Sequence, residues 1–246
     1  MAMEAQSTMI EAAAKAGVKW ILPTEYAGDG MNEAMVNAVP VFHPKRAARQ
    51  QIEELSKQPG CEGLKWIGVA TNPWLEASLQ RGLFAINPKE KKATLYPDGG
   101  KFNTSTLDLV GLGMARLLSL PITVPSNPRA SLEHYGNNFV YLSSFLVSQT
   151  QILESIQRVT KISDSEWDID RSKTIKQWIA DSREAMGKGN MMAGLGLTFA
   201  VYMGEGMGGD YDAKAREDRE VLGLPEENLD ECVRKAVEGE QAAPLF

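Results

Sequence analysis

The amino-terminal segment limits the possible fold most, because it has the pattern of a helix followed at once by a strand. Glu4 to Ala16 is rich in Ala and Met, and Gly17 follows as a residue typical of the position just past a helix end. Val18 to Leu22 is a short apolar run stopped by Pro23, which is typical of a strand buried on both faces. Helix, glycine and buried strand form half of a βαβ unit, so the sequence predicts a parallel sheet.

The same order of elements then recurs. A second helix is predicted from His43 and Pro44, with proline at a favoured first position, to about Ser56. Leu64 to Ala70 is the next buried strand, and Thr106 to Leu120 is an amphipathic helix. These elements predict an α/β fold whose parallel sheet is followed by a helix-rich portion over the carboxyl ends of the strands.

The second half of the chain is predicted to be mostly helical. Residues 121–138 are rich in Pro, Ser and Asn and predict a surface loop. Ser148 and Gln151 match a capping box that opens a helix reaching Val159. The other expected elements are short strands at Ala93–Tyr96 and Phe139–Leu142, and helices at Lys173–Met186, Met191–Gly204 and Leu229–Val237.

Composition narrows the function classes. The formal charge is -6 and the 26 basic residues are scattered, so neither nucleic acid nor an anionic membrane is an expected partner. Cys61 and Cys232 lie far apart without metal-ligand spacing, so we expect no metal site and free thiols in a reducing compartment. The most apolar run, Met191 to Gly204, is shorter than the roughly 20 residues of a membrane span. Without a secretory signal, a cytoplasmic protein is expected.

Several segments, in order, carry a family resemblance. GVKWILPTEY at 17–26, FHPKRAAR at 42–49 and TNPWL at 71–75 resemble the isoflavone-reductase-like branch of the NmrA-like family, and KATLY at 92–96, YLSS at 141–144 and LGLPEE at 222–227 also match it. The resemblance implies a Rossmann-like dinucleotide-binding domain with a smaller, helix-rich substrate domain, NADPH as cofactor and aromatic substrates. On this basis residues 1–120 are the carboxy-terminal part of the dinucleotide-binding domain, and residues 121–246 are mostly substrate or lid region with one returning sheet strand at 139–142.

Lys45 is the predicted catalytic residue. It lies in the first turn of its helix, where the helix dipole lowers the pKa of an ammonium, and Arg49 on the same face lowers it further. A lysine so placed can exchange protons near neutral pH. The resemblance implies that Lys45 transfers the proton and that Arg49 contacts the cofactor. The alternative is that Lys45, Arg46 and Arg49 form the solvated face of an amphipathic helix.

Four further residues are candidate site residues. Glu25 follows the first strand, where α/β sheets bind ligands, although an acidic cap on the next turn is an equal alternative. The resemblance places Asn72 beside the cofactor and Trp74 beside the substrate, and Trp74 can equally be a core residue. His43 either lines the pocket beside Lys45 or caps the helix. A Ser/His/Asp triad has no support in the sequence.

A dinucleotide site needs a G-x-G-x-x-G turn between a strand and a helix, and none precedes the first helix here. Gly111 and Gly113 lie inside a helical pattern and the glycines at 204–209 follow a helix, so both groups are interpreted as packing and loop glycines. The resemblance places three strands before the first helix, so a sheet lacking its first strands is expected. A truncated gene product, a partner that supplies the missing part and a decayed paralogue all remain open.

Two classes of function follow. The first is an NADPH-dependent reductase of an aromatic or polyketide-type secondary metabolite, with Lys45 handling the proton. The alternative is a non-catalytic, NmrA-like dinucleotide sensor or regulator, or an inactive fragment. Lys45 and Arg49 favour the enzyme, whereas the missing glycine turn favours the alternative.

Overall fold

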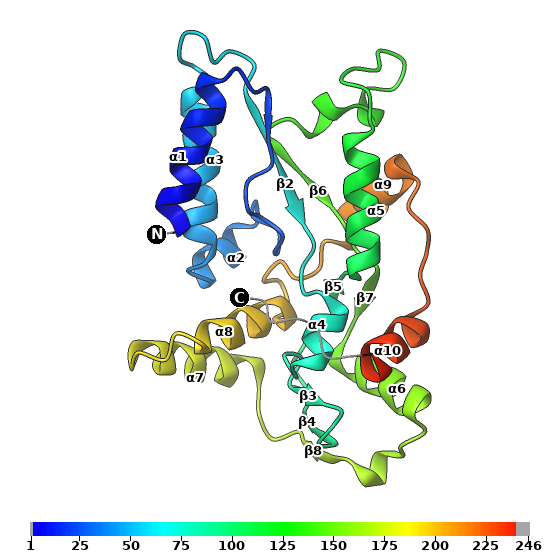
Figure 1. Ribbon diagram of the computed structural model, residues 1–246. Coiled ribbons are helices and arrows are strands. Elements are labelled where there is room, and N and C mark those ends of the chain that lie inside the picture. The colour runs from blue at the N-terminus through cyan, green and yellow to red at the C-terminus, as the bar shows by residue number, and fades with distance from the viewer. Residues whose placement is uncertain (1, 240–246) are drawn as a thin grey trace.

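The computed structural model describes residues 2–239, with side chains from residue 5 onward, and a short parallel sheet lies at its centre (Figure 1). Its strands are β1 (Trp20–Ile21), β2 (Lys65–Ala70) and β6 (Asn138–Tyr141), in the order β1-β2-β6. Both pairings are parallel. The predicted α/β class is confirmed, and so is the strand that returns to the sheet from the second half of the chain.

Helices cover both faces of this sheet. α1 (Ala2–Lys15) and α3 (Phe42–Leu55) lie side by side on one face, and α5 (Leu107–Leu118) lies on the other (Figure 1). Because successive strand residues point to opposite faces, Trp66 and Phe139 pack toward α1 and α3, whereas Ile67 and Val140 pack toward α5. The strands are apolar on both faces in the sequence, and such strands are stable only when helices cover both faces of the sheet.

The first strand differs from its prediction. A strand buried on both faces was expected at Val18–Leu22, but β1 has only two residues, both half-buried, and Val18 is exposed. The cause is its position: within residues 2–239, β1 pairs with β2 alone and leaves its other edge uncovered. A groove of about 340 Å³ runs between that edge and α1.

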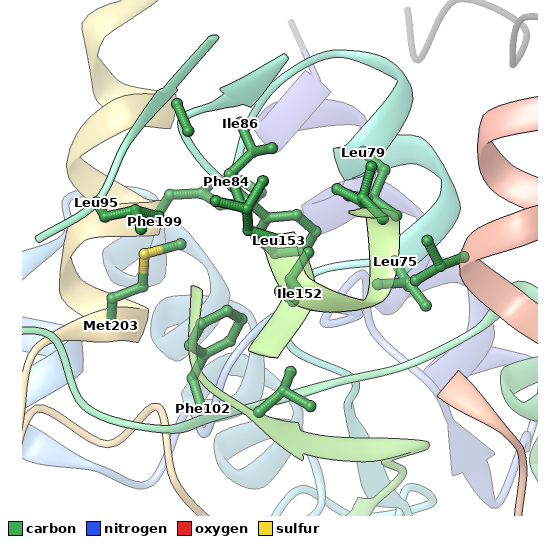
Figure 2. Packing of buried hydrophobic residues seen from close by; sticks show 14 of the residues in the cluster. Leu75, Leu79, Phe84, Ile86, Leu95, Phe102, Ile152, Leu153, Phe199 and Met203 are labelled. Carbon is green, nitrogen blue, oxygen red and sulfur yellow. The ribbon is translucent and has the colours of Figure 1, made fainter. Parts of the chain in front are cut away.

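A second hydrophobic core lies beyond the carboxyl ends of the parallel strands. Leu75, Phe84, Phe102 and Phe199 contribute to it from four different segments (Figure 2). The elements around this core are α4 (Leu75–Gln80), β3 (Ile86–Asn87), β4 (Lys92–Thr94), β5 (Phe102–Thr104), β7 (Phe145–Val147), α6 (Gln149–Thr160), β8 (Asp168–Asp170) and α10 (Leu229–Glu238).

The remaining helices connect the parallel sheet with the second hydrophobic core. α7 (Ile175–Gly187) and α8 (Ala193–Met203) form an antiparallel pair, and α8 also packs on α2 (Glu33–Ala38), which follows β1. α9 (Asp212–Leu222) packs beside β6. Short 3₁₀ helices occupy Pro128–Ala130, Leu132–Tyr135 and Asp164–Glu166. Within residues 2–239, no helix combines the length and apolarity needed to span a bilayer.

Most long elements agree with the sequence-based predictions. Gly17 ends α1 with φ +76°, and Ser148 and Gln151 form the expected capping box at the start of α6. Three helices were not predicted: α2 and α4, which have six residues each, and α9. The segment at 121–137, which ends where β6 begins, is a loop that contains two short 3₁₀ helices.

Gly111 and Gly113 lie in the same helix, α5, in opposite environments, and this difference predicts opposite effects of alanine. A Cβ at Gly111 meets nothing within 4 Å, so G111A should raise the free energy of unfolding by about 0.5–1 kcal/mol through the lower entropy of the unfolded chain. A Cβ at Gly113 would lie 2.8 Å from the buried Leu142 side chain, so G113A should lower the free energy of unfolding by about 1–3 kcal/mol. Urea unfolding curves measure both, and equal effects at the two positions would contradict this packing.

Candidate functional site

The candidate site lies where the chain leaves β1 and β2. Residues 22–31 follow β1, and residues 71–74 follow β2, so both segments lie at the carboxyl edge of the parallel sheet. Open α/β sheets bind ligands at this edge. Ala27 pairs with Ala70, and its carbonyl oxygen accepts hydrogen bonds from the Thr71 and Asn72 amides at 2.8 and 3.0 Å. The two segments are therefore tied together.

Lys45, the fourth residue of α3, reaches the segment that follows β1. Its Nζ donates hydrogen bonds to the carbonyl oxygens of Thr24 at 2.5 Å and Glu25 at 2.7 Å. Burial lowers the pKa of the ammonium; the Glu25 charge opposes this shift and the Arg49 charge adds to it. The direction agrees with the sequence-based prediction, but the largest cause is burial, which neither the helix dipole nor the spacing to Arg49 indicates.

Arg49 is buried under the same segment, with 5% of its surface exposed. Its guanidinium donates to Glu25 Oε1 at 2.5 Å and to the Gly30 carbonyl at 2.9 Å. The rings of Trp66 and Phe139 lie against it, with centroids 5.3 and 5.2 Å from Cζ. The alternative interpretation, a solvated helix face, is therefore wrong for Arg49. A contact from Arg49 to the cofactor stays a prediction.

Glu25 is 2% exposed, and its carboxylate faces Arg49. Oε1 accepts the Arg49 hydrogen bond, whereas the buried Oε2 has no hydrogen-bond partner among the described residues. A buried carboxylate is stable only when a cation neutralises it. The Glu25 and Arg49 side chains therefore depend on each other.

A cavity of about 190 Å³ opens beside these residues. Asn72 and Trp74 line it from the end of β2, and Tyr26 lines it from the segment after β1, whose Thr24 and Glu25 carbonyl groups accept the hydrogen bonds of Lys45. Lys45 itself is not among the lining residues. Phe199 and Tyr202 contribute from α8. Trp74 is half-buried and donates to Thr71 Oγ1 at 3.2 Å, so one part of its surface faces the cavity and another packs inside.

Asn72 has a left-handed backbone, with φ +51°, and is 3% exposed. Its Nδ2 donates to the Gly209 carbonyl at 2.7 Å, and its buried Oδ1 has no hydrogen-bond partner in the described part of the chain. A buried acceptor without a partner is costly, which makes Oδ1 a place where a ligand's N–H or O–H group would be stabilised.

His43 is separated from this group. Its side chain is exposed, and it does not line the cavity. The residue preceding α3 is Val41, so His43 is not the helix cap either. The described residues contain no group of three or more His, Cys, Asp or Glu side chains arranged to hold a metal ion.

Sequence reasoning missed a polar cluster beside Arg49. Asp29, 3% exposed, accepts a hydrogen bond from the Tyr141 hydroxyl at 3.0 Å and pairs with Lys214 at 2.7 Å. Lys214 also donates to the Tyr141 hydroxyl at 3.1 Å. Burial, followed by the Asp29 charge, raises the pKa of Tyr141. These residues come from three distant segments, and the sole local signal is that Asp29 stands between two glycines.

Those two glycines, Gly28 and Gly30, follow a strand and precede a short helix, but they serve packing. A Cβ at Gly28 would overlap the Met35 and Tyr202 side chains. A Cβ at Gly30 would lie 2.7 Å from the Phe139 ring and 2.9 Å from Arg49 Nη1. Side chains fill the space that a phosphate would need, so this turn is not a pyrophosphate site.

No family model matches the sequence. Among curated proteins, the chain is 26% identical over 239 residues to the oxidoreductase aprR of Aspergillus flavus, with 97% of this chain and 74% of that protein covered. It is 27% identical to the oxidoreductase poxI of Penicillium oxalicum, with 95% of this chain and 70% of that protein covered. Its curated relatives are therefore oxidoreductases.

Solved structures share the fold. An isoflavone reductase superposes with a TM-score of 0.69 at 18% identity, covering 95% of this chain and 71% of that one. The leucoanthocyanidin reductase–NADPH complex of Vitis vinifera gives 0.63 at 17% identity, covering 96% and 75%. A mutant NmrA gives 0.59 at 12% identity, covering 95% and 69%. The chain thus has the Rossmann-like fold of NADPH-dependent reductases and of NmrA, as its sequence motifs predicted.

The buried Arg49–Glu25 pair predicts a large and asymmetric cost of mutation. R49M leaves the Glu25 carboxylate buried without its cation and should lower the free energy of unfolding by about 3–5 kcal/mol. Adding E25Q to R49M removes that charge and should recover part of the loss. The exposed pair between Arg46 and Glu33 is the control, and R46M should cost less than about 1 kcal/mol. Urea unfolding measures all three, and equal losses in R49M and R46M would contradict the assignment.

Proposed function

We propose that this protein is an NADPH-dependent reductase that acts on a small aromatic or polyketide-type secondary metabolite, with Lys45 as the proton-transfer residue. The observation that carries the proposal is the position of Lys45. Its Nζ is held by two carbonyl groups immediately before Tyr26, which lines the aromatic cavity. The oxidoreductase relatives and the NADPH-dependent neighbours support the same chemistry.

The residues present suit the nicotinamide end of NADPH better than its pyrophosphate. Asn72 Oδ1 is a buried acceptor beside the cavity, and it would accept a hydrogen bond from a carboxamide or hydroxyl group. The Gly28–Gly30 turn does not fit a pyrophosphate, since side chains fill it. When bound, NADPH supplies the hydride. We assign residues 1–120 to the cofactor domain and most of 121–246 to the substrate region.

The walls of the cavity give it an aromatic preference. Trp74 and Phe199 offer ring faces and edges to a flat ligand, and Leu195 adds apolar surface from α8. A flat ligand that covers these surfaces would exclude water from them, which would strengthen a hydrogen bond to Asn72. The free thiols Cys61 and Cys232 fit a reducing, cytoplasmic setting.

The hydrogen bonds of Lys45 suit a single proton transfer. An ammonium has three donors, and the carbonyl groups of Thr24 and Glu25 accept two of them. The third proton can pass to a substrate oxygen, and the neutral amine that remains still has two N–H groups for the same two carbonyls. Because burial lowers the pKa of Lys45, this loss is easier than from an exposed lysine.

The first prediction concerns the side chain of Lys45. K45M should lower kcat for NADPH-dependent reduction of an aromatic quinone such as menadione by about 100-fold or more, the usual contribution of general acid–base catalysis. The control is K57M, because Lys57 is exposed just beyond the end of the same helix. Steady-state NADPH oxidation gives kcat and KM, and full kcat in K45M would refute the catalytic role.

The second prediction concerns pH. If protonated Lys45 is the acid, kcat should fall as pH rises through its folded-state pKa, and the midpoint should lie below the ordinary value of 10.5. In K45R the side chain stays protonated, so this alkaline decline should disappear along with most of the activity. A midpoint at or above 10.5, or the same decline in K45R, would contradict the proposal.

A second candidate is a dinucleotide sensor without turnover, since a mutant NmrA shares the fold of this chain. Titration calorimetry with NADPH, together with the oxidation assay, separates the two. Binding without oxidation across a panel of quinones and aromatic ketones would favour the sensor, whereas oxidation that depends on Lys45 favours the reductase.

A further inference from the structure

Tyr26 is an unusual residue in the wall of the cavity. Its φ is +34°, a left-handed conformation that a bulky side chain rarely adopts, and 37% of its surface is exposed. Such a conformation persists only where the surrounding contacts hold it, and it is frequent at ligand sites. The contacts on either side of Tyr26 therefore need an explanation.

The first anchor is the ion pair before Tyr26. The Glu25 carboxylate is drawn inward to Arg49, whose second hydrogen bond goes to the Gly30 carbonyl. One guanidinium therefore holds both ends of the segment 25–30. Because the Arg49 guanidinium also packs against the rings of Trp66 and Phe139, it stays in place and holds the segment 25–30 against the sheet.

The second anchor lies beyond Tyr26. Asp29 Oδ2 pairs with Lys214 of α9 at 2.7 Å, and Oδ1 accepts from the Tyr141 hydroxyl at 3.0 Å and the Met31 amide at 2.9 Å. The Lys214 ammonium lies 4.6 Å from the centroid of the Tyr141 ring. Between the two anchors, the Ala27 carbonyl oxygen accepts hydrogen bonds from the amides that follow β2. Tyr26 is therefore the residue whose backbone conformation changes the direction of the chain.

We propose that the Arg49–Glu25 and Lys214–Asp29 pairs are positioning devices that hold Tyr26 as a specificity-determining wall of the cavity. The proposal rests on the proposed function, since it takes the cavity as the substrate site. The described hydrogen bonds of Lys214 go to Asp29 and Tyr141, neither of which lines the cavity, so Lys214 acts through Asp29 and the backbone of 26–29. A substitution of Lys214 on α9 therefore changes the position of the Tyr26 ring in the cavity wall.

The test is a double-mutant cycle between two residues that do not touch. Binding of menadione, a flat naphthoquinone, is measured by quenching of tryptophan fluorescence in wild type, K214M, Y26A and the double variant. K214M and Y26A should each weaken binding about fivefold, and K214M should add little in the Y26A background, a coupling that residues acting through one another show. Independent, additive effects, or no effect of K214M, would overturn the proposal.

Two further variants separate positioning from general stability. R216M removes a neighbouring ion pair on α9, with Asp212, and should leave menadione binding unchanged. Y26N places a residue that tolerates the left-handed conformation, so it should keep or raise the melting temperature while still weakening binding. A loss of melting temperature in Y26N comparable with that in Y26A would contradict the backbone argument.

The assay contains no NADPH, so its outcome is independent of turnover. Coupled loss of menadione binding in K214M and Y26A supports the positioning proposal even if no reductase activity is found. Reductase activity that requires Lys45, with additive or absent effects of K214M and Y26A on binding, supports the proposed function and overturns the positioning proposal. A wild-type chain that shows no saturable menadione binding also overturns it.

Discussion

The buried guanidinium of Arg49 is the interaction on which the site depends. It packs against the rings of Trp66 and Phe139 on the face of the sheet, and it neutralises Glu25 while donating to the Gly30 carbonyl. Without that charge, the carboxylate at the end of β1 would be buried alone. The segment that follows β1 would then lose its main link to α3, the helix that also carries Lys45.

The aromatic cavity depends on this local arrangement. Lys45 donates to carbonyl groups whose positions Arg49 helps to set, and Tyr26 comes next in the chain. Asn72 also lines the cavity; its Nδ2 donates to the Gly209 carbonyl, and its buried Oδ1 has no hydrogen-bond partner among the described residues. Charge, aromatic surface and a buried acceptor thus meet at the carboxyl edge of the sheet, although the residues come from α3, α8 and the ends of β1 and β2.

The sequence predicts those parts of the fold that local periodicity specifies. The helix at 2–15, the buried strand at 65–70 and the capping box at Ser148 were all recognisable because each is specified by neighbouring residues. The six-residue helices α2 and α4 were missed because they span fewer than two turns, too short for a periodic pattern. The burial of β1 was overestimated, since apolar composition does not reveal which edge of a strand is paired.

The site was predictable only in part, for the same reason. Lys45, Arg49 and Glu25 were chosen from motifs, but the pairing of Arg49 with Glu25 joins residues 24 positions apart, and that of Lys214 with Asp29 joins residues 185 apart.

The most direct test of the proposed site is a structure of the protein with NADPH and menadione bound. We expect the quinone ring to lie against Trp74 and one quinone oxygen to lie within about 3.2 Å of Lys45 Nζ, the reach of a proton-transfer group. A quinone bound elsewhere, with Lys45 still bonded only to the carbonyl groups of Thr24 and Glu25, would contradict it.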